Sequence, residues 1–252
     1  MFLLIDAQNA FPLNVKGEPL LFDAPVYPIT TRASLPGGIV AARLSGAAAS
    51  QLGEQVGDAR SHACDPLVAR AVGALGAKER MRFDPADGSA LTWDEAGEAG
   101  RGASGVPVFP RIDPCVIGLV RSPRRDAILL GENARRPGYY TCVAGYVSVG
   151  EALEEAWRRE VLEETGRRVD SCAYAGSQPW PHTGALMMAM VSTARQEEPS
   201  QPPDGELRSI LWVERQDVAA LPLARQGSIA RRLIDAWVRG DLEGEQDQWQ
   251  LM

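Results

Sequence analysis

One stretch of the 252-residue chain constrains its fold more than any other: GYVSVGEALEEAWRREVLEETGRR, residues 145–168. Its apolar side chains Leu153, Trp157 and Val161 recur at every fourth position. This spacing predicts an amphipathic helix that begins near Glu151 and packs one stripe on a hydrophobic core. With 45% hydrophobic residues, the chain has enough apolar material to bury that core, which excludes disorder for most of its length.

The same helix gathers Glu160, Glu163 and Glu164 on neighbouring positions of one surface. Carboxylates so close repel one another unless cations compensate, and hard divalent ions such as Mg²⁺ prefer carboxylate oxygens. A competing interpretation is a solvated helix laced by salt bridges, because several glutamates have an arginine four residues later. These pairs are Glu154–Arg158, Glu155–Arg159, Glu163–Arg167 and Glu164–Arg168. The charge pattern alone favours this second interpretation.

The full spacing of the stretch favours the metal site instead. Gly145 is followed after five residues by Glu151, and after seven more by Arg159-Glu160. An apolar residue, the pair Glu163-Glu164 and Gly166 then follow at fixed positions. These positions would recur together by chance on the order of once in 10⁵ chains of this composition, so the pattern is far more specific than a lone glycine-rich match.

Charge and cysteine content exclude several other classes. The chain has 26 Lys and Arg against 33 Asp and Glu, and neither half is basic, so an extended nucleic-acid surface is not expected. Four scattered cysteines without a CxxC pair, and only two histidines, argue against a closed zinc site or a disulfide framework. No stretch resembles a membrane span or a signal peptide. We therefore expect a soluble cytoplasmic protein that does not act at a membrane.

The first part of the chain, residues 1–82, is predicted to form a small α+β domain. Its expected strands are Phe2–Ile5, Leu20–Phe22 and Gly38–Leu44. A helix capped by Asp65 follows and is expected to end at Gly76. Residues 83–108 are polar and glycine-rich, which indicates a linker with a hairpin around Trp93.

Residues 109–242 contain stronger apolar runs and are predicted to form the second domain. The expected strands are Cys115–Val120, Ala127–Leu130, Tyr140–Val143, Ala185–Val191 and Ile210–Val213. Ser228 is expected to cap a closing helix that ends before Gly240. Arg195–Gly205 is expected to be a polar loop, and residues 243–252 a frayed tail.

The motif is the Nudix box, and the sequence closely resembles the Nudix hydrolases. One position departs from it, because the family usually has an apolar residue after the last glycine and this chain has Arg167. The resemblance implies an α/β fold, a Nudix α/β/α sandwich here preceded by the smaller α+β domain. It also implies that Mg²⁺ or Mn²⁺ bridges the glutamates to a substrate pyrophosphate. The implied roles are metal binding for Glu160 and Glu164, a further ligand or the base for Glu163, and orientation of the set for Arg159 and Glu151.

A second motif, SQPWPHTGALM at residues 177–187, resembles the SQPWPFPxS signature of the NADH pyrophosphatase family. Further matches extend this resemblance over residues 109–240. By this resemblance, the Ala144 carbonyl and Glu206 would join the metal shell, and Phe109 of a partner subunit in a homodimer would contact the base of the substrate. The pocket residues implied in the same way are Gln178, Pro179, Trp180, Pro181, His182, Ala185 and Ala230. An ordinary Pro-Trp-Pro loop packed on a core edge is the structural alternative.

Two features depart from that family. His182 replaces a phenylalanine whose ring could stack on the substrate, so it is either a pocket residue or a loop residue with no role. The other departure concerns a zinc ribbon that typically joins the two domains. Its four cysteine positions are occupied by Asp84, Asp87, Arg101 and Ser104. We therefore expect a metal-free loop and no zinc in this chain.

The predicted function is divalent-metal-dependent hydrolysis of the pyrophosphate bond of NADH or NAD⁺ to nicotinamide mononucleotide and AMP. The family resemblance also permits removal of an NAD cap from the 5′ end of RNA, although the acidic halves argue against extended RNA contact. A first alternative is hydrolysis of another nucleoside diphosphate compound such as ADP-ribose. A second is a non-catalytic nucleotide-sensing module, which the intact set of glutamates argues against.

Overall fold

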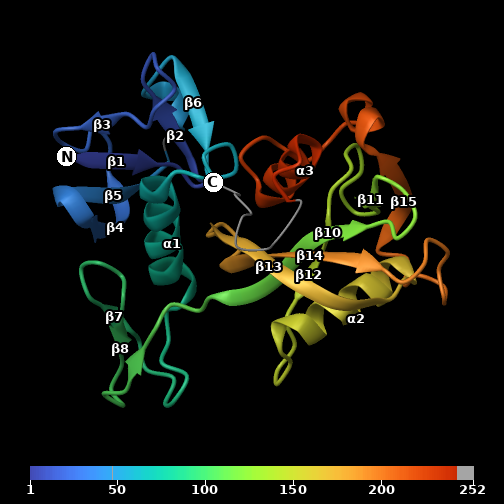
Figure 1. Ribbon diagram of the computed structural model, residues 1–252. Coiled ribbons are helices and arrows are strands. Elements are labelled where there is room, and N and C mark those ends of the chain that lie inside the picture. The colour runs from blue at the N-terminus through green and yellow to red at the C-terminus, as the bar shows by residue number, and fades with distance from the viewer. Residues whose placement is uncertain (47, 243–252) are drawn as a thin grey trace. The chain divides into compact units, whose positions relative to one another are not determined.

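The computed structural model describes residues 1–46 and 48–242, so the tail predicted at 243–252 lies outside the described residues (Figure 1). The chain forms two compact units. The first comprises Met1–Ile112 and Pro179–Ala185, and the second comprises Asp113–Gln178 and the chain from Leu186 onward. No helix in the described part of the chain is both long and apolar enough to cross a membrane.

The first unit contains a four-stranded sheet. Its strands are β1 (Phe2–Ile5), β3 (Leu21–Phe22), β4 (Ile29–Leu35) and β5 (Ile39–Leu44). The order is β3-β1-β5-β4, with β1 and β5 parallel. Leu3 and Ile5 pack on one face with side chains of helix α1 (Pro66–Arg80), whereas Leu4 belongs to a separate cluster with Ala42. Alternation along β1 therefore places apolar side chains on both faces, as expected for a strand buried on both sides.

Helix α1 begins as predicted but continues beyond its predicted end. The Asp65 carboxylate accepts hydrogen bonds from the N–H groups of Leu67 and Val68 at 2.8 and 3.2 Å, which confirms it as the cap. The helix then runs through Gly76 to Arg80, so the expected end at Gly76 is wrong. Gly76 is buried on the packed side of the helix, and that packing outweighs the roughly 1 kcal/mol that an interior glycine costs.

The rest of the first unit is built from very short strands. They are β2 (Ala10–Leu13), β6 (Gln55–Asp58), β7 (Thr92–Trp93), β8 (Gly100–Arg101) and β9 (Pro107–Val108). Strand β2 pairs with β6, and β7, β8 and β9 form a three-stranded sheet. The antiparallel pair Trp93–Gly100 confirms the hairpin predicted around Trp93.

Hydrogen bonds hold the loops at the four positions where the resembled family has cysteines. Asp84 is 1% exposed, and its carboxylate accepts from the Ala86 N–H at 2.9 Å and from the Ser104 hydroxyl at 2.5 Å. Ser89 donates its hydroxyl proton to Asp87 at 2.6 Å and accepts from the Ala103 N–H at 2.7 Å. These polar contacts connect the two loops.

The second unit is built on a six-stranded sheet. Its strands are β10 (Asp113–Arg121), β11 (Ala127–Asn133), β12 (Val143–Tyr146), β13 (Val169–Trp180), β14 (Ala185–Ala194) and β15 (Leu207–Glu214). The order is β13-β14-β10-β11-β15, and β12 pairs with β10. Helices α2 (Leu153–Thr165) and α3 (Ile229–Arg239) complete this unit, together with a short 3₁₀ segment at Arg215–Ala220. The first unit has short 3₁₀ segments at Pro36–Gly38 and Ala49–Gln51.

Alternation along β10 divides the second unit into two cores. Ile117 and Leu119 pack in the cluster that contains α3, whereas Val116 and Val120 pack in the cluster that contains Trp157 of α2. The two helices therefore cover opposite faces of the sheet, which confirms the predicted α/β/α sandwich.

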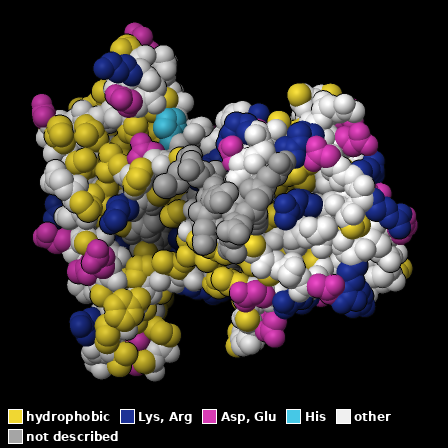
Figure 2. All heavy atoms as spheres, viewed as in Figure 1, with side chains coloured by type: hydrophobic (Ala, Val, Ile, Leu, Met, Phe, Trp, Pro, Cys, Tyr) yellow, Lys and Arg dark blue, Asp and Glu magenta, His cyan; other side chains and the backbone are white. Residues whose placement is uncertain are grey.

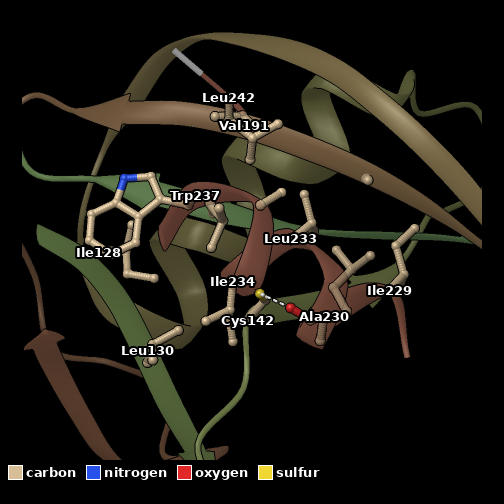
Figure 3. Close-up of a cluster of buried hydrophobic side chains, with 14 of the residues drawn as sticks. Ile128, Leu130, Cys142, Val191, Ile229, Ala230, Leu233, Ile234, Trp237 and Leu242 are labelled. Carbon is tan, nitrogen blue, oxygen red and sulfur yellow. Dashed lines mark hydrogen bonds between the residues drawn. The ribbon is translucent and has the colours of Figure 1, made fainter. Parts of the chain in front are cut away.

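Helix α3 has the boundaries predicted from its caps. The Ser228 hydroxyl accepts from the Arg231 N–H at 3.3 Å, and Gly240 ends the helix in the left-handed conformation with φ 85°. Figure 3 shows Leu233, Ile234 and Trp237 of this helix within the hydrophobic core. This packing fixes the side of the sheet opposite α2.

Two strands differ from the prediction. The run expected at Tyr140–Val143 is displaced toward the C-terminus as β12, because Tyr140 and Thr141 form only isolated bridges. Strand β13, which includes most of the SQPWP motif, was not predicted, because Gly176 and Pro179 are typical of turns. It lies at an edge of the sheet, where a proline that donates no hydrogen bond is tolerated.

The hydrogen-bonded loops lead to a prediction about zinc and stability. Ser104→Ala leaves a buried oxygen of Asp84 without the hydroxyl donor, so the free energy of unfolding should fall by about 1–3 kcal/mol. Urea denaturation measures this change, with the exposed Ser50→Ala as the matched control. Elemental analysis of the wild-type protein should find no stoichiometric zinc, and one equivalent of zinc would overturn the interpretation.

Candidate active site

Helix α2 carries the carboxylates of the box at different depths. Glu160 and Glu164 are 9% and 3% exposed, and both lie on the side of the helix that packs on the sheet. Glu163 is exposed. The helix therefore holds two buried carboxyl groups, Glu160 and Glu164, whose burial makes the charged form costly. The third, Glu163, is accessible to solvent.

Arg159 joins three of the glutamates. Its guanidinium donates to both oxygens of Glu151 at 2.8 and 3.0 Å, to Glu160 at 2.7 Å and to Glu163 at 2.9 Å. It also donates to the Tyr146 carbonyl at 3.0 Å. The hydrogen bond to Arg159 lowers the pKa of Glu151, so this pair stays ionised. Arg159 thus links Glu151 to Glu160 and Glu163.

Gly145 lies directly against the carboxylate of Glu160. A Cβ atom at position 145 would stand 1.9 Å from Cδ of Glu160 and 2.0 and 2.1 Å from its two oxygens. Any side chain there would force the Glu160 carboxylate to move, because such contacts are far inside van der Waals range. The first glycine of the box therefore allows the buried Glu160 side chain to approach strand β12 closely.

Glu164 is the most strongly perturbed group of the cluster. Burial, together with the nearby charges of Glu206, Glu160 and Asp204, raises its pKa to about 9, against a hydrogen bond from the Ala144 backbone. Burial also raises the pKa of Glu160, although Arg159 opposes this. Both effects show that negative charge accumulates here in a poorly solvated place.

Glu206 and Asp204 bring this charge from a loop distant in the sequence. The Glu206 N–H donates to Asp204 at 2.8 Å, and Asn133 donates to the Glu206 carboxylate at 3.2 Å. Asp204 was not predicted as a site residue, although it stands in the same short acidic segment as Glu206. Cys115 lies near the cluster, where burial together with Glu160 and Glu164 raises the pKa of its thiol to about 12.

The donor atoms gathered here suit a hard cation. Carboxylate oxygens come from Glu160, Glu163, Glu164 and Glu206, and the Ala144 backbone hydrogen-bonds to Glu164. Within residues 1–46 and 48–242, no three His, Cys, Asp or Glu side chains are already arranged as a metal site. The oxygens of Glu160 and Glu163 are engaged by Arg159 instead. An all-oxygen set with uncompensated buried charge fits Mg²⁺ or Mn²⁺.

Gln178 of the second motif has a defined role in the second unit. It is 2% exposed, its amide nitrogen donates to the Gly227 carbonyl at 2.8 Å, and its amide oxygen accepts from the Ile229 N–H at 2.7 Å. It therefore connects β13 to the first turn of α3. Ala230, in the same turn, is 4% exposed and packs in the α3 core.

The remaining predicted pocket residues belong to the first unit. The rings of Trp180 and His182 meet edge to face, with centroids 4.7 Å apart. Pro179, Pro181 and Ala185 lie in the same segment, and Phe109 is 65% exposed. His182 thus has an aromatic neighbour that orients its ring.

The comparison with known families now decides the family. The model of the NUDIX domain matches residues 111–237, half of the chain. The chain belongs to the NUDIX family. A crystal structure of a NUDIX hydrolase from Nitrosomonas europaea is similar in fold, with a TM-score of 0.53 and 18% identity over 63% of this chain and 91% of that chain. This likeness confirms the fold of the NUDIX domain.

Curated relatives resemble the same half of the chain. NAD-capped RNA hydrolase NudC of Salmonella paratyphi C (strain RKS4594) is 42% identical over 128 residues, which are 50% of this chain and 48% of the relative. The protein of the same name from Salmonella choleraesuis (strain SC-B67) matches with the same identity and coverage. The chain thus spans about half the length of the curated relatives it matches.

The raised pKa of Glu164 predicts how stability depends on pH without metal. Between its usual value of 4.5 and about 9, the folded chain keeps a proton that the unfolded chain releases. The free energy of unfolding therefore falls as pH rises through this window. In EDTA, Glu164→Gln should show a shallower fall than wild type in urea denaturation between pH 5 and 9.

Glu154→Gln is the matched control, because Glu154 is an exposed carboxylate on the same helix. Its pH profile should follow that of the wild type. Parallel profiles for wild type and Glu164→Gln would contradict the assignment of this titration to Glu164.

Proposed function

We propose that the chain is a divalent-metal-dependent hydrolase that cleaves the pyrophosphate bond of NADH or NAD⁺. The observation that carries this proposal is the buried carboxylate cluster, whose repulsion is uncompensated at Glu164. The proposed ligands of Mg²⁺ or Mn²⁺ are Glu160, Glu163, Glu164, Glu206 and the Ala144 carbonyl. When bound, such an ion neutralises charge on the pyrophosphate oxygens and lowers the pKa of a coordinated water.

The residues of the chain then divide the remaining tasks. Glu163 is exposed, so its carboxylate can reach a water at the substrate and take its proton as general base, or it can serve as a further ligand. Arg159 holds Glu160 and Glu163 in place through its 2.7 and 2.9 Å hydrogen bonds. Glu151 fixes Arg159 in turn, so that both act by orientation.

The proposed substrate class rests on the second motif and on the relatives. The SQPWP run resembles the NADH pyrophosphatase signature, and the curated relatives are named NAD-capped RNA hydrolases. The proposed products from NADH or NAD⁺ are nicotinamide mononucleotide and AMP, and the NAD-capped 5′ end of RNA is a further proposed substrate. No zinc is proposed as a cofactor, because the hydrogen bonds of Asp84 and Ser104 already join the loops.

One observation favours ADP-ribose as a second candidate substrate. His182 and the residues after it replace the aromatic and proline residues of the resembled signature, and the His182 ring packs edge to face on Trp180. A substrate without a nicotinamide ring does not need that stacking surface. The same carboxylate cluster would serve its pyrophosphate.

We also propose that the chain works as a cytoplasmic homodimer in which Phe109 reaches the partner's substrate. Figure 2 shows apolar side chains gathered over β7 and β8. The exposed apolar residues of this part of the first unit are Phe83, Val106, Phe109 and Ile112. Exposed patches of this kind commonly mark protein contacts. All four cysteines are free thiols, which suits a reducing compartment.

Removing a proposed metal ligand should abolish hydrolysis without unfolding the chain. Glu160→Gln keeps the shape of the side chain but removes its charge, so turnover of NADH in Mg²⁺ or Mn²⁺ should fall at least ~100-fold. Release of AMP measures turnover, and circular dichroism checks the fold. Glu154→Gln is the control on the same helix, and near wild-type turnover of Glu160→Gln would refute the proposal.

Phe109→Ala tests the proposed role of the exposed aromatic. Loss of stacking on a nucleobase should raise KM for NADH roughly tenfold and leave kcat nearly unchanged. Tyr27→Ala, which removes an exposed aromatic outside this patch, should leave KM unchanged. Sedimentation velocity should show that the wild type is a dimer, and a monomeric wild type would contradict the proposed dimer. An unaltered KM in Phe109→Ala would rule out the proposed role of Phe109.

A further inference from the structure

Arg167 is the one position where the box departs from its usual pattern, and its side chain has specific partners. Its guanidinium donates through Nε to the Glu197 carbonyl at 2.6 Å and through Nη1 to the Thr165 carbonyl at 2.7 Å. It also lies 5.7 Å from the centre of the Trp212 ring. An apolar residue could cover Trp212, but it could donate to neither carbonyl.

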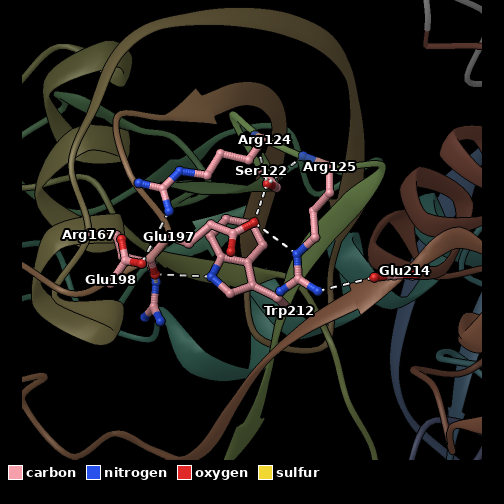
Figure 4. Close-up of polar contacts among 8 residues, drawn as sticks. All are labelled: Ser122, Arg124, Arg125, Arg167, Glu197, Glu198, Trp212 and Glu214. Atoms are coloured by element: carbon pink, nitrogen blue, oxygen red, sulfur yellow. Dashed lines mark hydrogen bonds and ion pairs between the residues drawn. The ribbon is translucent and has the colours of Figure 1, made fainter.

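Glu197 lies near the start of loop 195–206, which connects β14 to β15 and contains Asp204 and Glu206. Figure 4 shows its partners: the Trp212 indole donates to its carbonyl at 3.1 Å, and Ser122 and Arg125 donate to its carboxylate at 2.5 and 2.9 Å. The Glu197 carbonyl thus accepts from both Arg167 and Trp212. Arg167 connects this point of the loop to the last turn of α2.

Further contacts hold the loop along the end of α2. Ser200 donates both its N–H and its hydroxyl to the Gly166 carbonyl, at 2.7 and 3.0 Å. Gly166 has φ 70°, and a Cβ atom there would lie 2.1 Å from the carbonyl oxygen of Gln201. The Asp204 N–H then donates to the Glu163 carbonyl at 2.9 Å. The loop therefore follows the box residues closely up to the acidic segment that contains Glu206.

We propose that Arg167 is a positioning residue, which holds loop 195–206 against α2 so that the Glu206 carboxylate joins Glu160 and Glu164 at the metal. This inference rests on the proposed function, because it takes the carboxylate cluster to be the metal site. Arg167 itself does not touch the metal or the substrate. It acts through the Glu197 carbonyl at one end of the loop, and its effect is passed on by the Ser200 and Asp204 contacts.

The test measures Mn²⁺ binding directly, by isothermal titration calorimetry. Arg167→Leu should weaken Mn²⁺ affinity about tenfold, as expected when a supporting contact of a metal site is lost. Arg168→Leu removes the same charge from the next, exposed residue and should leave the affinity unchanged. Hydrogen exchange in metal-free protein should be faster at residues 200–206 in Arg167→Leu than in wild type.

A double-mutant comparison separates positioning from general destabilisation. If Arg167 acts through Glu206, Arg167→Leu should not weaken Mn²⁺ binding further in the Glu206→Gln background. An additional tenfold loss there, or an unchanged affinity in the single variant, overturns the proposal. If Arg167→Leu does not fold, Arg167→Lys is measured in its place. Its Mn²⁺ affinity should be lower than that of the wild type by less than tenfold. An unchanged Mn²⁺ affinity overturns the proposal.

The same titrations distinguish this proposal from the proposed function. Wild-type protein that binds no Mn²⁺ refutes the metal-dependent function, and the role of Arg167 in metal binding fails with it. If Arg167→Leu binds Mn²⁺ as tightly as the wild type does, the proposed role of Arg167 is refuted and the proposed function is not.

Discussion

Repulsion among carboxylates in a poorly solvated place is the constraint on which the second unit depends. Arg159 compensates the charge of Glu160 and Glu163, but burial and neighbouring carboxylates leave Glu164 with a pKa of about 9. A fold tolerates such a group only where the rest of the structure determines its place. The sheet, the contact between Gly145 and Glu160, and loop 195–206 all hold the carboxyl groups in place. A divalent cation would compensate their charge.

Directed polar contacts hold both units at places where the resembled families use other means. In the first unit, the Ser104 hydroxyl donates to Asp84, at two positions where the resembled family has cysteines. In the second, Arg167 donates to two carbonyls at a position that is usually apolar. In both places, hydrogen bonds occur at positions where the resembled families have metal ligands or an apolar residue, and each depends on burial to be effective.

The sequence predicted the elements whose signals are local. Helix α2 follows from its apolar stripe, and α3 follows from Ser228 and Gly240, because caps and periodicity act within a few residues. Helix α1 continued past Gly76 because packing on a sheet distant in sequence outweighed the propensity of one glycine. Strand β13 was missed because its edge position, which tolerates Pro179, depends on the order of the sheet.

For the site, too, the residues close together in the sequence were predicted more readily than those brought in from elsewhere in the chain. Spacing on one helix located Glu160, Glu163 and Glu164, whereas Glu206 came only from resemblance, because a loop brings it to α2 from elsewhere in the chain. Asp204 and the contacts of Arg167 could not be predicted, since they depend on how that loop packs. The substitution of Arg167 in the box was nevertheless visible in the sequence, and it marked a place where the structure departs from the usual pattern.

The central claim, that this carboxylate cluster hydrolyses NAD-linked pyrophosphates with a divalent cation, is tested most directly by a substrate ranking. The measurement is kcat/KM in Mg²⁺ and in Mn²⁺ for NADH, NAD⁺, NAD-capped RNA and ADP-ribose, with products identified by mass spectrometry. The expected result is that the NAD-linked substrates rank first and that EDTA abolishes turnover. Tight dinucleotide binding without turnover, or undiminished turnover in EDTA, would contradict the claim.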